Sequence, residues 1–130
     1  MSRRVRILIV DDHDALRRAI RNLLESSRGF EICGEAKDGL EALKQAADLK
    51  PDVVILNIVM PVMDGFEAAR KIRALSPQSQ IVILSSHTDE RLLQEARDVG
   101  AVCYVPKSEA GRELLDAVKA AAGGESSAVL

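Results

Sequence analysis

The sequence predicts an α/β fold, namely a doubly wound, five-stranded parallel sheet of (βα)5 organisation with the strand order 2-1-3-4-5. Three observations predict it. Short apolar runs alternate along the chain with longer segments in which apolar residues recur at helical spacing. The run Val53–Leu56 is apolar without interruption, as in a central strand that helices cover on both faces. The run Phe30–Ala36 alternates apolar with charged residues, which is typical of an edge strand.

The first strand–helix unit covers residues 5–24. Val5–Val10 is an apolar run, and the acids Asp11 and Asp12 follow it directly. In residues 15–24 the apolar side chains recur at helical spacing, which predicts an amphipathic helix. The arginines of this helix lie away from the apolar stripe, and we expect a solvated face made of Arg17, Arg18 and Arg21.

The second unit contains the expected edge strand. Its apolar residues fall on one face and its glutamates on the other, as period-2 alternation requires. The first face holds Phe30, Ile32 and Ala36, and the second holds Glu31 and Glu35. Asp38-Gly39 then caps a helical segment that ends at Lys50-Pro51, because the residue before a proline disfavours helical geometry.

The remaining three units repeat this order. Each predicted strand ends in a polar group: Val53–Leu56 ends at Asn57, Ile81–Leu84 at Ser85, and Val102–Val105 at Pro106-Lys107. Each is followed by a helical pattern. The helices begin at Asp64-Gly65, after Thr88 and after Ser108, and they end before Pro77, at Gly100 and at Gly123-Gly124.

The composition narrows the function classes. The chain has 130 residues, of which 47% are hydrophobic, so one domain can bury its own core. We expect that domain over residues 1–124, with residues 125–130 as a C-terminal tail or the start of a linker. A net charge of -2 provides no basic field, so we expect no nucleic-acid binding through this domain and no membrane association.

The amino-acid composition also indicates the cell compartment and the absence of a site for stacking ligands. Aromatic residues make up 2% of the chain, which leaves almost no platform for stacking bases or flavin rings. No apolar run is long enough to span a bilayer, and no signal peptide is evident. Cys33 and Cys103 lie in apolar segments without metal-ligand spacing, and we interpret them as small core residues. The expected compartment is the cytoplasm.

Polar side chains follow four of the predicted strands at their carboxyl ends, the edge where open α/β sheets bind ligands. These side chains are Asp11, Asp12, Asn57, Ser85 and Lys107. Carboxylates and backbone carbonyls suit Mg²⁺. A hydroxyl and an ammonium beside them suit in-line phosphoryl transfer by positioning and charge neutralisation. The pattern therefore predicts a Mg²⁺-dependent phosphoryl site that lacks a nucleophile.

With these residues in place, the chain resembles a response-regulator receiver domain of two-component signalling. The resemblance rests on Asp11-Asp12, on Met60-Pro61 with Met63-Asp64-Gly65, and on Ser85 and Lys107, in that order. The segments Phe30–Ala36 and Ser85-Ser86-His87 further resemble the NarL/LuxR type, in which a helix-turn-helix domain follows the receiver. The resemblance implies the flavodoxin-like, CheY-like arrangement of the predicted sheet.

The resemblance also implies a role for each matching residue. Asp12 would bind Mg²⁺ directly, Asp11 would assist through water, and the Val59 carbonyl would be a further ligand. Ser85 would be the switch hydroxyl, Lys107 the cation that binds the phosphoryl group, and Tyr104 the aromatic that changes rotamer with the switch. The implied partners are a sensor histidine kinase or a phosphotransfer protein, and a homodimer is also left open.

The chain departs from the family pattern at two places. Asn57 stands where the phosphoacceptor aspartate is expected, and an amide is a poor nucleophile because its nitrogen lone pair is delocalised. We therefore expect that phosphoacceptance is lost, and that Mg²⁺ binds weakly because one charged ligand is missing. The usual Lys-Pro pair is replaced by Pro106-Lys107, and the isomer of the Val105–Pro106 bond is left open.

Alternative functions remain at this point. The nearest is a pseudo-receiver that acts as a protein-interaction domain without phosphorylation. A small flavodoxin-like or phosphatase-like enzyme is another, although Asp11-Asp12 would repel a phosphate and Asp12 is the remaining candidate nucleophile. A third is a structural domain that dimerises through its last helices. His13 and His87 are interpreted as exposed loop residues without a role.

Overall fold

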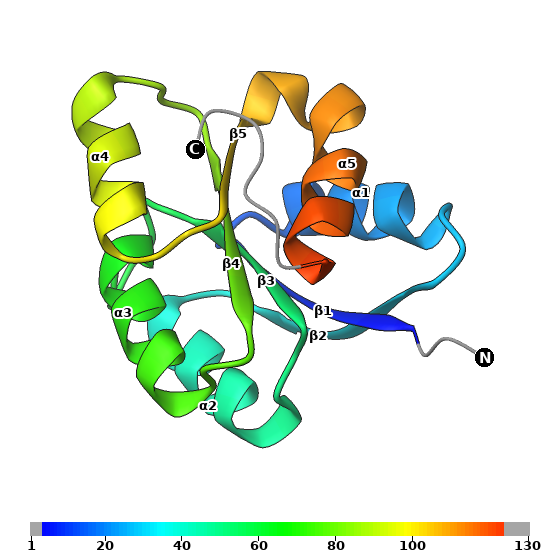
Figure 1. Ribbon diagram of the computed structural model, residues 1–130, viewed down its shortest axis with the longest axis horizontal. Helices are drawn as coiled ribbons and strands as arrows, with labels where there is room; N and C mark the ends of the chain where they lie inside the picture. The colour runs from blue at the N-terminus through cyan, green and yellow to red at the C-terminus, as the bar shows by residue number, and fades with distance from the viewer. Residues whose placement is uncertain (1–3, 124–130) are drawn as a thin grey trace.

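The apolar runs of the sequence form one sheet of five parallel strands (Figure 1). They are β1 (Val5–Val10), β2 (Phe30–Ala36), β3 (Val53–Asn57), β4 (Gln80–Ser85) and β5 (Cys103–Pro106). The computed structural model describes residues 4–123, so the tail expected over residues 125–130 lies outside the described residues. The strand order is β2-β1-β3-β4-β5, which confirms the predicted doubly wound fold and the edge position of β2.

Helices cover both faces of this sheet. They are α1 (Asp14–Glu25), α2 (Gly39–Leu49), α3 (Gly65–Leu75), α4 (Glu90–Asp98) and α5 (Ala110–Ala122), with a 3₁₀ turn η1 (Lys107–Glu109) before the last. Helices α1 and α5 lie on one face, and α2, α3 and α4 lie on the other (Figure 1). Within residues 4–123, none of the helices has both the length and the apolar character needed to cross a membrane.

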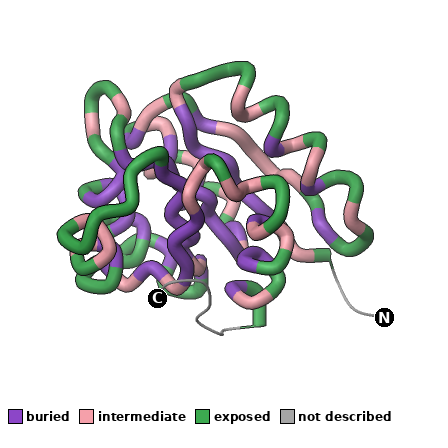
Figure 2. Tube along the Cα trace, turned by 90° about the horizontal axis from the view of Figure 1, so that it is seen from above, coloured by how far each residue is buried: buried purple, intermediate pink, exposed green. Residues whose placement is uncertain are grey.

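The sheet divides the core into two clusters. In β1, Ile7 and Ile9 pack toward α1 and α5, whereas Leu8 and Val10 pack toward α2, α3 and α4. Every residue of β3 is buried, and Figure 2 shows buried segments running through the centre of the molecule with exposed segments outside. Burial of each such apolar side chain contributes roughly 1.5–3 kcal/mol, so the two clusters together fix the positions of the strand ends.

The start of α3 packs closely against the end of β3. The Asp64 side chain caps α3 by accepting a hydrogen bond from the Glu67 amide at 2.9 Å, as the sequence predicts. The Gly65 amide donates to the Ile58 carbonyl at 2.6 Å. A Cβ atom at residue 65 would lie 2.0 Å from the Asn57 carbonyl oxygen, so only glycine fits there. This close approach fixes the backbone of Asn57.

A β-bulge interrupts the pairing of β2 with β1. Ile7 pairs with Ile32, but the next residue of β1, Leu8, pairs with Gly34. Cys33 is therefore an extra residue in β2, and its Sγ atom lies 3.4 Å from the Ile7 carbonyl oxygen. On the other side of the strand, a Cβ atom at Gly34 would lie 2.3 Å from the side chain of Gln45 in α2. The bulge thus occurs where α2 approaches the strand.

The bulge reverses the alternation expected for β2. Phe30 packs toward α1 and α5, but Ala36 packs toward α2, α3 and α4. Glu35 pairs with Ile9 and therefore faces α1, on the side of the sheet opposite to Glu31. The expectation that the apolar residues share one face and the two glutamates the other is wrong, because one inserted residue shifts every later side chain to the opposite face.

The loop between β3 and α3 contains a strained residue, Val62, whose φ is +72°. The Met63 amide donates to the Pro61 carbonyl at 2.8 Å and closes a three-residue turn around it. A β-branched residue in this left-handed region is disfavoured by about 1–2 kcal/mol. Val62 is 75% exposed, so little packing offsets the strain.

We expect Val62→Asn to raise the free energy of unfolding by about 1 kcal/mol, because asparagine tolerates the left-handed region. Urea unfolding measures the change. Val59→Asn is the matched control, since Val59 is 68% exposed in the same loop and its φ is not positive. An equal gain in both variants would assign the effect to the loss of an exposed apolar side chain instead of backbone strain.

Candidate functional site

The carboxyl ends of β1, β3, β4 and β5 meet at one edge of the sheet and form a pocket of about 250 Å³. It is lined by Asp12, His13, Asn57, Val59, Ser85, Ser86, His87 and Lys107. Asp11 contacts this group and is 1% exposed. A larger groove of about 560 Å³, between α2 and the end of α3, contains none of the predicted site residues. The structure thus brings the predicted acids, amide, hydroxyl and ammonium together.

Asn57 is the last residue of β3 and is 6% exposed. Its Nδ2 atom donates one hydrogen bond to the Val59 carbonyl at 2.8 Å and another to Asp12 Oδ1 at 3.2 Å. Both acceptors are oxygens that the family resemblance assigns to a metal ion. The carboxamide therefore presents N–H donors to two expected metal ligands and links β3 to the acidic segment after β1.

Asp11 is the buried acid of the site. Its Oδ1 atom accepts a hydrogen bond from the His13 amide at 2.9 Å. Its Oδ2 atom accepts no hydrogen bond from the residues that the structure describes, but Lys107 Nζ lies 3.1 Å away and forms an ion pair with it. The peptide bond between Val105 and Pro106, just before Lys107, is trans. Lys107 therefore pairs with Asp11 where residue 57 offers it no carboxylate.

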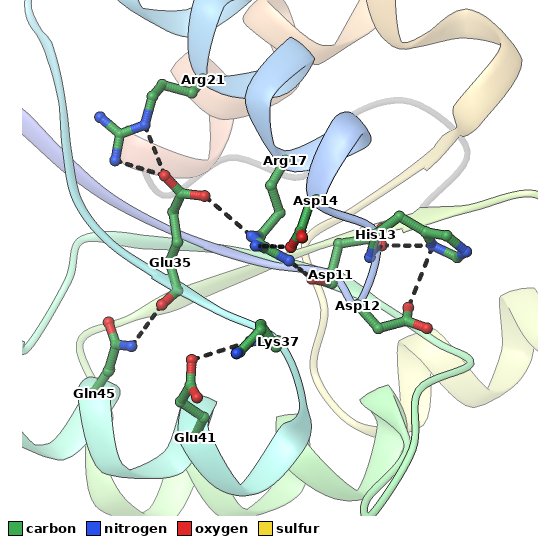
Figure 3. A network of polar contacts seen from close by, with 10 residues as sticks. All are labelled: Asp11, Asp12, His13, Asp14, Arg17, Arg21, Glu35, Lys37, Glu41 and Gln45. Atoms are coloured by element: carbon green, nitrogen blue, oxygen red, sulfur yellow. Dashed lines mark hydrogen bonds and ion pairs between the residues drawn. The ribbon is translucent and has the colours of Figure 1, made fainter.

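His13 belongs to the site, although the sequence assigned it no role. Its ring is 66% exposed, as expected for a loop residue, but its Nδ1 atom lies 3.0 Å from Asp11 Oδ1 and 3.4 Å from Asp12 Oδ1 (Figure 3). The turn that joins the His13 amide to the Asp11 carboxylate brings the ring to the acids. An aspartate directly after a strand, with a polar residue two positions later, is the sequence signal for this turn.

The oxygen atoms of the acidic segment suit a hard divalent cation. One ligand atom from each of Asp11, Asp12 and His13 lies within 4.8 Å of the others, and the Val59 carbonyl faces the same pocket. The buried Oδ2 atom of Asp11, which accepts no hydrogen bond from residues 4–123, has Lys107 Nζ at 3.1 Å as its charged neighbour. The site fits Mg²⁺, and two of the oxygens that would hold the cation, on Asp12 and Val59, accept hydrogen bonds from the Asn57 amide.

Ser85 and Tyr104 are linked through the loop after β4. Ser85 is 2% exposed, and its hydroxyl accepts a hydrogen bond from the His87 amide at 3.0 Å. Tyr104 is completely buried. Its hydroxyl donates to the His87 carbonyl. Burial raises the pKa of Tyr104, and a hydrogen bond with Ser85 opposes this. A movement of the loop would therefore affect both side chains.

Arg17 is held by neighbouring groups and is not part of a solvated face. Its side chain is 11% exposed, and its guanidinium contacts Asp14, Glu35 and the Asp11 carbonyl (Figure 3). Arg21 also pairs with Glu35, whereas Arg18 is exposed as expected. The expectation of a common solvated face is wrong because the bulge in β2 turns Glu35 toward α1.

Glu35 accepts hydrogen bonds from both arginines, from Arg17 Nε at 3.0 Å and from Arg21 Nε at 2.7 Å. Burial tends to raise the pKa of the Glu35 carboxyl, but the bonds from Arg21 and Arg17 outweigh burial and hold its pKa below the usual 4.5. The ionised form of Glu35 therefore stabilises the fold.

Comparisons with known proteins agree with this geometry. A family model described as "Response regulator receiver domain" matches residues 7–119. The transcriptional regulatory protein LiaR of Bacillus subtilis is 36% identical over 121 residues, which cover 93% of this chain and 57% of LiaR. The response regulator VraR of Staphylococcus aureus is 34% identical over 122 residues, 94% of this chain and 58% of VraR. The chain thus spans little more than half the length of these curated relatives.

Solved structures show the same fold. The signal receiver domain of the putative response regulator NarL from Mycobacterium tuberculosis superposes with a TM-score of 0.90 at 30% identity, and the match covers 95% of this chain and 100% of that one. A LuxR-family two-component response regulator from Aurantimonas sp. SI85-9A1 has a TM-score of 0.90 at 33% identity, with 95% of this chain and 88% of that chain covered.

Without divalent cations, we expect Asn57→Asp to lower the free energy of unfolding by about 2 kcal/mol. The change removes two hydrogen bonds and places a carboxylate where Asp12 Oδ1 lies 3.2 Å from the present amide nitrogen. Urea unfolding in EDTA measures the loss, and added Mg²⁺ should reverse part of it.

Asn57→Ala is the control for that measurement, because it removes the same hydrogen bonds without adding a charge. Added Mg²⁺ should raise the free energy of unfolding of Asn57→Asp but not that of Asn57→Ala. If Asn57→Asp were as stable as the present chain in EDTA, the amide would not be what holds the acidic segment to β3.

A pH dependence follows from Glu35. Because its pKa in the folded chain lies below 4.5, its contribution to stability is complete above 4.5 and is lost as the pH falls through the lowered value. Glu35→Gln should therefore be less stable than the parent at neutral pH, and the difference should shrink at pH values below 4.5. Urea unfolding across that range measures it.

Glu31→Gln is the matched control, since it removes an exposed carboxylate from the same strand. A Glu35→Gln difference that stays constant with pH would show that the arginines do not stabilise the ionised carboxyl.

Proposed function

The chain belongs to the response regulator receiver domain family, and we propose that it is a receiver module whose phosphoacceptance is blocked at Asn57. Members of this family are signalling modules and not classical enzymes, so the family assignment leaves the small-enzyme alternatives without support. One observation carries the proposal: the residue at the carboxyl end of β3 is a buried amide that donates hydrogen bonds to Asp12 and Val59.

The chemistry of the amide is the reason for the block. A carboxylate oxygen can attack phosphorus and form an acyl phosphate, whereas the amide lone pair of Asn57 is delocalised. The other carboxylates of the site are engaged as well. Asp11 pairs with Lys107, and Asp12 accepts a hydrogen bond from Asn57. In our proposal none of them replaces the missing nucleophile.

The other site residues keep their expected roles in this proposal. Asp12, Asp11 and the Val59 carbonyl would hold Mg²⁺, which supplies positive charge beside a phosphoryl group. Ser85 would donate its hydroxyl and Lys107 its ammonium to phosphoryl oxygens, and Tyr104 would follow the movement of Ser85. The hydrogen bonds that join Tyr104 and Ser85 to the backbone of His87 support a coupled movement of these two side chains.

We propose that Mg²⁺ binds weakly. Two carboxylates and one ammonium provide a small net negative charge, and affinity for a hard cation follows the number of charged ligands. The Asn57 amide also has to leave Asp12 and Val59 before a cation can take those oxygens. Both effects lower the affinity for Mg²⁺.

The partners proposed for the module are proteins. A sensor histidine kinase or a phosphotransfer protein would dock on it, and its output surface would comprise α4, β5 and α5. We place the receiver domain at residues 1–124, within a longer regulator like the curated relatives. The net charge of -2 supports the proposal that any nucleic-acid binding by such a regulator does not involve this domain.

A second candidate is a phosphorylation-independent pseudo-receiver that acts as a protein-interaction domain. The Asn57 hydrogen bonds favour it, because they satisfy the Asp12 and Val59 oxygens without a cation or a phosphoryl group. In this version a single conformation of the output surface would be recognised, either by another protein or by a second copy of the chain.

Incubation with a small acyl-phosphate donor and Mg²⁺, followed by intact mass measurement, tests the block. We expect Asn57→Asp to gain one phosphoryl group and the present chain to gain none. Asn57→Ala is the control, because a mass gain in that variant would identify Asp12 or another carboxylate as an acceptor. A stable phosphoryl adduct on the present chain would refute the proposal.

Calorimetric titration with Mg²⁺ tests the metal site. We expect Asn57→Asp to bind Mg²⁺ more tightly than the present chain, by about tenfold for one added charged ligand. Asp12→Asn in the Asn57→Asp background should remove most of that gain. Equal or tighter Mg²⁺ binding by the present chain would contradict the proposed competition by the amide.

A further inference from the structure

The Arg17 guanidinium connects the acidic segment to the edge of the sheet. Its Nη1 atom donates to the Asp11 carbonyl at 2.7 Å, and its Nε atom donates to Glu35 Oε1 at 3.0 Å. Its Nη2 atom pairs with Asp14 in the first turn of α1. One planar group therefore bonds to β2, to α1 and to the backbone between β1 and α1 (Figure 3).

Glu35 is itself held in place. Its second oxygen pairs with Arg21, and its backbone carbonyl accepts a hydrogen bond from Gln45 Nε2 at 2.5 Å. The bulge at Cys33 turns its side chain toward α1. Glu35 thus provides a fixed partner for Arg17, and the guanidinium fork is rigid enough to transmit that position to the Asp11 carbonyl.

We propose that Arg17 is a positioning residue for the cation site: it fixes the peptide between Asp11 and Asp12, and through that peptide the direction of both carboxylates. The proposal rests on the proposed function to the extent that these acids hold the divalent cation. Arg17 does not line the pocket that Asn57 lines, and its contact with the residues of the cation site is the hydrogen bond to the Asp11 backbone carbonyl.

The geometry supports an effect on the acids. The Asp11 amide donates to the Ala36 carbonyl at 3.1 Å, so β2 holds the Asp11 amide directly. The Asp11 carbonyl is linked to β2 indirectly, because Arg17 bonds both to that carbonyl and to Glu35. Asp12 follows without a strand partner, and its side chain is 28% exposed. Besides the hydrogen bond from Asn57 Nδ2, the preceding peptide therefore sets the orientation of Asp12. Groups that orient metal ligands typically change metal affinity by about 10- to 100-fold when they are removed.

Arg21 provides a matched control within the same helix. It pairs with the same carboxylate, Glu35, and with Glu25, but the hydrogen bonds that the structure gives it do not include the Asp11 carbonyl. Arg17→Gln and Arg21→Gln each remove one arginine partner of Glu35 and keep a side chain of similar helix propensity. If the two arginines acted only by stabilising the fold, the two substitutions would have similar effects on Mg²⁺ binding.

The test uses Asn57→Asp as the parent, because its Mg²⁺ affinity is expected to be higher. We expect Arg17→Gln to raise the Mg²⁺ dissociation constant by about tenfold and Arg21→Gln to change it much less, although both lower the free energy of unfolding. Equal Mg²⁺ affinity in the two variants would overturn the proposal. If Arg17→Gln does not fold, Arg17→Lys replaces it, because lysine keeps the charge but not the fork.

A metal-free readout separates this inference from the proposed function. Amide hydrogen exchange of Asp11, Asp12 and His13, measured in EDTA on the present chain, should be faster in Arg17→Gln than in Arg21→Gln. Equal exchange in both variants would overturn the positioning role even if Mg²⁺ binds as proposed. A parent that binds no Mg²⁺ would refute the proposed cation site, and the exchange rates would still decide whether Arg17 fixes the acidic segment.

Discussion

The hydrogen bonds of the Asn57 carboxamide are the interaction on which the site depends. They join the end of β3 to Asp12 and to the Val59 carbonyl, and all three residues line the same pocket. A carboxylate at the same place would repel Asp12, because two like charges so close together raise the energy of the folded state.

The packing around Asn57 fixes its backbone. Gly65 approaches its carbonyl so closely that a Cβ atom would lie 2.0 Å away, and all of β3 is buried. The positive charge of Lys107 lies beside the buried Asp11 carboxylate and forms an ion pair with it. The arrangement therefore combines a closely packed backbone at the end of β3 with a charge pair beside it.

Much of the site could be predicted because a parallel sheet brings the carboxyl ends of its strands to one edge. Asp11, Asn57 and Ser85 each follow an apolar run directly, so strand order alone places them together. His13 was missed because its contact with the acids arises from a local turn and a rotamer, which hydrophobic periodicity does not describe. That Asn57 stands where an aspartate is expected remains a prediction, which rests on the sequence and the family resemblance.

The sequence by itself determined the order of the strands, the two-sided core and the residues at the carboxyl edge, because these follow from apolar periodicity and connection rules. Only the tertiary structure decided the side of the sheet on which Glu35 lies. The inserted residue at Cys33 depends on how β2 pairs with β1 and packs against α2, and such long-range contacts leave no mark in local alternation. The bulge therefore makes possible the ion pair between Glu35 and Arg17, and Arg17 in turn donates a hydrogen bond to the Asp11 carbonyl.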